Sequence, residues 1–179
     1  MTLTLLEGAL LVFVLACALG SALLKDTLAA VMSFAAYSLG VSIIWLILQA
    51  PDVGLTEAAV GAGIMTILFL IALANTVTPD ADRLLESVRW RSVVLVGGFV
   101  VVMAATVPAL PTIGDPNGAV VAGEVSQYYL DNAYKQTGVR NAVTAVLAAY
   151  RGFDTLGEAV VVFAAGVAAL TVLRREVFA

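Results

Sequence analysis

Long apolar stretches alternate with short polar connections along most of the chain. Five of these stretches are long enough for a helix that crosses a bilayer, which takes about 20 mostly apolar residues. They run over residues 3–24, 28–48, 53–77, 93–110 and 156–173. The pattern therefore predicts an all-α, polytopic integral membrane protein with five transmembrane helices.

The first connections are short and polar. Lys25 and Asp26 predict a tight turn between the first two spans, and Pro51 suits the first helical position of the third. Residues 78–80 resemble a capped helix start, so residues 79–91 are expected to form a short amphipathic linker helix on the cytoplasmic side.

The second half of the chain carries the longer connection. Residues 111–140 predict a long external loop, with tyrosines typical of a membrane–water interface at positions 128, 129 and 134. Residues 141–150 predict an amphipathic surface helix before the last span. The expected modules are therefore 1–78 with three helices, the linker 79–91, and 92–179 with two helices.

The composition is typical of a membrane protein and excludes several classes of function. Hydrophobic residues make up 61% and charged residues 12%, against about 45–50% and about 25% in soluble domains. One cysteine and no histidine leave no usual ligand set for zinc, haem or an iron–sulfur cluster, so no metal or cofactor is expected. A net charge of −4 without a basic patch argues against nucleic acid, and no catalytic motif suggests an enzyme.

Glu57 is the sharpest chemical feature of the sequence, because it lies inside the third apolar stretch. A helix that starts at Pro51 places it roughly 9 Å along the axis. Carboxylates inside spans usually face a bundle interior or a wet cavity and often mark ion paths. The alternative is a first-turns glutamate that complements the helix dipole. Around it, Gly61 and Gly63 permit either close helix packing or a functional π-bulge.

Two further polar groups have both a functional and a structural interpretation. Lys25 and Asp26 either admit protons or contact a neighbouring subunit, or they form a solvated turn. Arg151 and Asp154 form an ion pair at the membrane edge or line an ion path. Thr155 and Glu158 have the spacing of a capping box at the start of the last span.

The distribution of basic residues predicts the orientation. With the N-terminus outside, six basic residues lie on the cytoplasmic side and three outside, as the positive-inside rule favours. The inner set is Lys25, Arg83, Arg89, Arg91, Arg174 and Arg175, and the outer set is Lys135, Arg140 and Arg151. The C-terminus is then cytoplasmic, in what we expect to be a prokaryotic plasma membrane.

Two segments together resemble a known family. Residues 50–63, APDVGLTEAAVGAG, resemble the core motif of the D-type subunit of energy-converting membrane-bound hydrogenases. Residues 141–158, from NAVT to RGFDTLGE, resemble the module that follows it, the E-type subunit. The same pair is similar to the C-terminal part of the large A subunit of Mrp-type cation/proton antiporters, and to the J-type subunit of respiratory complex I. One departure is that Ala149 and Tyr150 replace the Asp-Phe that many relatives carry before the arginine.

The resemblance implies a place in a multisubunit membrane complex beside antiporter-type subunits, in contact with lipid, Na⁺ and H⁺. It implies that Glu57 lies on a proton or sodium path and that Gly61 and Gly63 can allow a rearrangement. Asp154 and Glu158 become possible participants. The leading hypothesis is a subunit of an Mrp-type Na⁺(cation)/H⁺ antiporter. The alternatives are the matching subunit of a hydrogenase or complex I-like oxidoreductase, or a structural spacer.

Overall fold

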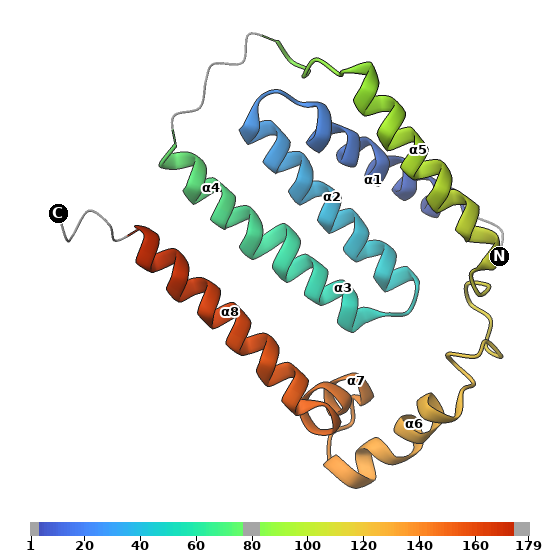
Figure 1. Cartoon of the computed structure of the whole chain (residues 1–179). Helices are drawn as coiled ribbons and strands as arrows, with labels where there is room; N and C mark the ends of the chain where they lie inside the picture. Colours follow the sequence, from blue (N-terminus) through green and yellow to red (C-terminus); the bar gives the residue numbers. More distant parts are fainter. Residues whose placement is uncertain (1–3, 77–82, 174–179) are drawn as a thin grey trace. The chain divides into compact units, whose positions relative to one another are not determined.

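The computed structural model describes residues 4–76 and 83–173 (Figure 1). Helices account for most of these residues, and no strand occurs among them beyond an isolated backbone bridge. The elements are α1 Leu5–Leu23, α2 Thr27–Ile47, α3 Pro51–Glu57, η1 Ala58–Met65, α4 Thr66–Ala74, α5 Trp90–Thr106, η2 Val107–Ala109, α6 Glu124–Thr137, α7 Ala142–Ala145, η3 Val146–Tyr150 and α8 Gly152–Leu173.

Five helices are long and apolar enough to cross a membrane. They are Leu5–Leu23, Thr27–Ile47, Pro51–Ala74, Trp90–Ala109 and Gly152–Thr171, which confirms the five predicted spans. Most large apolar side chains on them are exposed in the isolated chain. Surfaces of this kind need lipid or other apolar protein against them, so the chain is a multi-pass membrane protein.

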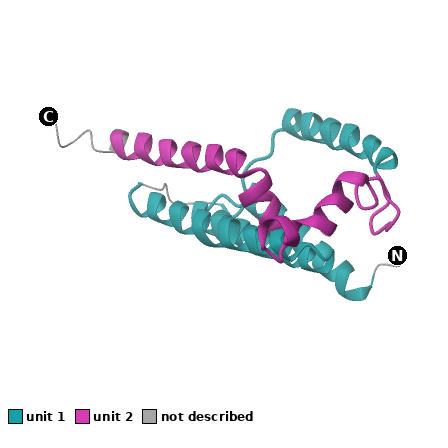
Figure 2. Cartoon of the chain, turned by 90° about the horizontal axis from the view of Figure 1, so that it is seen from below, with its two compact units in different colours: residues 1–110 teal, residues 111–179 magenta. Residues whose placement is uncertain are grey.

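The chain forms two compact units, residues 1–110 and 111–179 (Figure 2). In the first unit α2 lies between α1 on one side and the continuous α3–η1–α4 helix on the other (Figure 1). Side chains cap the N-termini of α1 and α2. Thr4 and Glu7 form a reciprocal capping box at α1, and the Asp26 carboxylate accepts the Ala29 N–H at 2.7 Å at the start of α2.

Small residues let the three helices of this layer approach each other closely. A Cβ at Gly20 would lie 2.5 Å from the Ser33 hydroxyl, and one at Gly54 would lie 2.9 Å from the Ser42 carbonyl oxygen. The Ser33 and Ser42 hydroxyls donate to carbonyls of the facing helices, at 2.9 Å and 2.7 Å. Association inside a membrane depends on such close packing and on hydrogen bonds between helices.

The predicted linker helix 79–91 is wrong over residues 83–89. Residues 83–89 are not helical, and α5 begins at Trp90. Their backbone pairs with the end of α1 instead. The Lys25 N–H donates to the Leu84 carbonyl oxygen at 3.1 Å, and the Glu86 N–H donates to the Leu23 carbonyl oxygen at 2.8 Å. A helix would turn these groups inward and lose both bonds. The predicted start at 78–80 lies outside the described residues.

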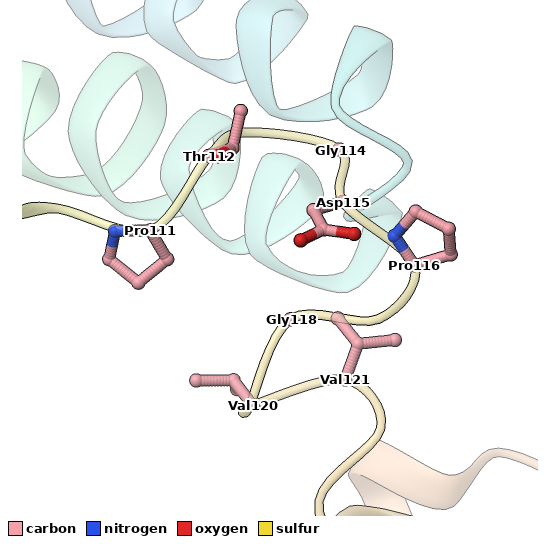
Figure 3. A pocket seen from close by; sticks show the side chains of 8 residues that line it. All are labelled: Pro111, Thr112, Gly114, Asp115, Pro116, Gly118, Val120 and Val121. Carbon is pink, nitrogen blue, oxygen red and sulfur yellow. The ribbon is translucent and has the colours of Figure 1, made fainter.

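The second unit also departs from the predicted loop over 111–140. Residues 124–137 form helix α6, whereas residues 111–121 are irregular and enclose an open hollow of about 380 Å³ (Figure 3). The predicted surface helix is present as α7 and η3, with Asn141 as its N-cap. Its position at the membrane surface and the module boundaries at 78 and 92 stay predictions.

The close approach at Gly54 makes a testable stability prediction. Replacing Gly54 with Ala places a methyl group against backbone that cannot move aside, so we expect unfolding free energy to fall by about 1–3 kcal/mol. Denaturant titration of the purified chain in mixed detergent micelles measures it. The control is Gly97→Ala in α5, where a Cβ meets nothing within 4 Å. Equal stability of the two variants would contradict the packing described here.

Candidate functional site

Glu57 is the last residue of α3 and adjoins the π-helix η1. Pro51 occupies the first turn of α3, where its missing N–H removes no helical hydrogen bond, and Asp52 adds a negative charge at this positive helix end. The Glu57 side chain is half-buried against α2. The carboxyl group is therefore beyond the first turn, and its neighbours come from the middle of α2.

Ser38 of α2 is the hydrogen-bond partner of Glu57. The Ser38 hydroxyl is 2.5 Å from Oε1 of Glu57 and 3.3 Å from the main-chain oxygen of the same residue. Ser38 is 1% exposed. An O–H···O separation of about 2.5–2.7 Å is typical when the acceptor is a charged carboxylate. The structure thus provides the intramembrane carboxyl with a buried donor from the adjacent helix.

Gly61 leaves the space that Ser38 occupies. A Cβ at Gly61 would lie 1.8 Å from the Ser38 oxygen and 3.0 Å from Oε1 of Glu57. No side chain fits at such distances, so any larger residue at position 61 displaces the hydroxyl or separates the helices. A Cβ at Gly63 would meet only the Ala58 carbonyl oxygen, at an ordinary 3.5 Å. Only Gly61 is required by this contact.

The eight residues Ala58–Met65 that follow Glu57 form a π-helix. The buried Thr66 hydroxyl donates to the Gly61 carbonyl oxygen, five residues earlier, at 3.0 Å. π-Helical turns are rare in proteins, and those that do occur often lie at functional sites. This one lies where the sequence suggested a π-bulge, and a conformational role for Gly61 and Gly63 stays a prediction.

Lys25 and Asp26 lie far from Glu57. Ser38 comes twelve residues after Asp26, which is about 18 Å along α2. The Asp26 carboxylate caps α2, and Lys25 lines a cleft of about 260 Å³ with Arg83, Leu85, Glu86 and Ser87. A role of either residue in ion movement stays a prediction.

The second motif has a different local structure from the predicted one. Arg151 Nε and Asp154 Oδ2 form the expected ion pair at 2.7 Å, with both side chains more than half exposed. The capping box of Thr155 and Glu158 is wrong, because α8 already begins at Gly152 and Thr155 lies inside it. The Thr155 hydroxyl instead donates to the Leu147 carbonyl oxygen at 2.7 Å. Glu158 is exposed, and its functional role stays a prediction.

A cluster of tyrosines joins α6 to η3 in the second unit. The centroids of the Tyr129 and Tyr150 rings lie 4.9 Å apart. The Gln136 side chain accepts a hydrogen bond from the Tyr150 hydroxyl and donates one to the Tyr128 hydroxyl. Burial, together with Tyr128 and Tyr129, raises the pKa of Tyr150 above its ordinary 10. Tyr150 is therefore a neutral donor at physiological pH, and this cluster has the character of a packing contact.

Ser38 is not among the site residues that the sequence predicted. The available signal was the pair Ser38 and Ser42, four residues apart and hence on one face of an otherwise apolar helix. Both hydroxyls donate to the α3 segment.

Across the described ranges, no group of three or more His, Cys, Asp or Glu side chains is arranged to hold a metal ion.

Comparisons with known proteins identify the families that the two halves of the chain resemble. Residues 12–77 match the family model MbhD, for the D-type subunit of MBH, and residues 93–178 match MbhE, for the E-type subunit. The protein named "Putative antiporter subunit mnhA2" of Staphylococcus haemolyticus is 32% identical over 133 residues, 74% of this chain and 16% of that relative. The "Na(+)/H(+) antiporter subunit A1" of Staphylococcus aureus is 28% identical over 152 residues, 84% of this chain and 18% of that relative.

The two models in this order, together with the apolar spans, define a membrane protein with a D-type domain followed by an E-type domain. The chain contains one domain that matches each of these two family models, and the resemblance to the A subunit of Mrp-type antiporters is confirmed over most of its length. The chain spans about a sixth of the length of the curated relatives it matches.

Proposed function

We propose that this chain is a membrane subunit of a multisubunit Mrp-type Na⁺(cation)/H⁺ antiporter and contributes to its translocation path and its assembly. The two staphylococcal antiporter subunits support the class. Other antiporter-type membrane subunits and small subunits of the complex would be its partners. The chain itself has a transport role and not an enzymatic one.

The observation that carries the proposal is the Glu57 carboxyl, held by a buried hydroxyl beside a π-helix in a spanning segment. A carboxyl in such a place can exchange a proton with a hydrated chain of polar groups. One charge that crosses a potential of 100 mV gains about 2.3 kcal/mol, so its movement can drive coupled transport. In this proposal Asp154, Glu158, Lys25 and Asp26 contribute at the ends of the path.

A second candidate follows from the names of the two family models, which are those of MBH subunits. In a hydrogenase or complex I-like oxidoreductase, the chain would translocate ions while electrons move through other subunits. A spacer that only keeps antiporter-type subunits in register is a third possibility, and it gives Glu57 no role in exchange.

The substitution Glu57→Gln separates transport from a structural role. We expect the assembled complex to lose exchange activity by about a hundredfold or more, the usual contribution of a proton-transferring side chain. Cation-dependent dissipation of ΔpH in inverted vesicles, made from a host without antiporters that expresses the whole operon, measures it.

The matched control for that experiment is Glu7→Gln, because Glu7 is a carboxylate in a capping box that a glutamine can also form. Normal exchange by an assembled Glu57→Gln complex would favour the spacer. A wild-type operon without any exchange would favour the oxidoreductase.

For the orientation we propose an outside N-terminus and a cytoplasmic C-terminus, on the basis of the distribution of basic residues. Single cysteines at exposed Lys25 and Lys135, in a chain whose Cys17 is replaced by serine, test it. A membrane-impermeant thiol reagent added to intact cells should label position 135 and spare 25, and permeabilised cells should label both. The reverse labelling would overturn the orientation.

A further inference from the structure

The hydroxyl of Ser38 has two acceptors, and both belong to Glu57. It lies 2.5 Å from the carboxyl oxygen Oε1 and 3.3 Å from the main-chain oxygen. A serine hydroxyl has one hydrogen to donate, so it serves these acceptors alternately or unequally. The shorter distance identifies the carboxyl as the preferred acceptor in this conformation.

Ser42 shows what a purely structural serine looks like on the same helix face. Its hydroxyl is equally buried and donates to one main-chain oxygen, that of Gly54, at 2.7 Å. Ser38 shares this pattern of donation to the facing backbone, but it adds the side-chain acceptor. The difference between the two serines is therefore confined to the contact with the Glu57 carboxyl.

A buried hydroxyl that loses its only acceptor destabilises the fold. Ser38 does not face this cost when the Glu57 side chain leaves, because the main-chain oxygen of Glu57 remains within reach. Gly61 keeps the hydroxyl at this position in both cases, since no Cβ intrudes on it. The arrangement lets the carboxyl move without leaving the buried Ser38 hydroxyl unpaired.

From this geometry we infer that Ser38 is the positioning residue of Glu57. The Ser38 hydroxyl holds the carboxyl in a resting position against α2, and it transfers its hydrogen bond to the Glu57 main-chain oxygen when the carboxyl swings into the translocation path. The inference rests on the proposed role of Glu57 as the relay and specifies how that relay is held and released.

Modification of Glu57 by a hydrophobic carbodiimide, followed by mass spectrometry of the purified whole complex, tests the inference. In Ser38→Ala the carboxyl is no longer held, so we expect it to react about tenfold faster, which is the size of effect that one hydrogen bond can have. Ser42→Ala, which removes an equally buried hydroxyl from the same interface, should react at the wild-type rate. Ser38→Thr keeps a hydroxyl and should restore slow modification.

A second variant reaches the same contact from the other helix. Gly61→Ala places a Cβ 1.8 Å from the Ser38 oxygen, so it should displace the hydroxyl and also speed modification of Glu57. Equal rates in Ser38→Ala and Ser42→Ala, or failure of Ser38→Thr to slow the reaction, would overturn the inference. Because modification reports only how the carboxyl is held, a failed transport role for Glu57 would appear separately, as normal exchange by Glu57→Gln.

Discussion

A carboxyl group inside a membrane-spanning helix is expensive unless protein or water solvates it, and much of the first unit follows from this constraint. Glu57 needs a donor, and Ser38 of α2 supplies one at 2.5 Å. That donor can approach only because position 61 has no side chain. The π-helix that begins directly after Glu57 contains Gly61. The carboxyl, the space left by the missing side chain at Gly61 and the irregular backbone therefore form one structural unit.

The same layer shows how α2 serves both of its neighbours. Ser33 and Gly20 fit together toward α1, while Ser42 and Gly54 fit together toward α3. Hydrogen bonds and close packing replace the hydrophobic effect, which does not drive helices together in lipid. In contrast, the side chains of α5 and α8 are mostly exposed in the isolated chain. These helices require lipid or other apolar protein against them, which fits the proposed place of the chain in a larger membrane complex.

The features that depend on composition were predicted correctly from the sequence. The predictions were wrong where contacts between distant residues determine the local structure. Hydropathy located all five spans, and the polar residue Glu57 marked the site. Residues 83–89 were misassigned because their extended form depends on pairing with Leu23 and Lys25, more than 50 residues away. Thr155 was misassigned as a cap because α8 starts three residues earlier, at Gly152. Ser38 was overlooked because its importance arises only from the facing Gly61 and Glu57.

Ser38 of α2 holds the Glu57 carboxyl beside a polar path in its resting position, and the carboxyl does not face lipid. A density map of the assembled complex in a lipid nanodisc, at a resolution that shows side chains and ordered water, tests this most directly. We expect the Glu57 carboxyl to lie against Ser38 beside the π-helix, with water or polar groups of a neighbouring subunit on its other side. A regular α-helix over residues 58–65, or a Glu57 side chain surrounded by lipid, would contradict it.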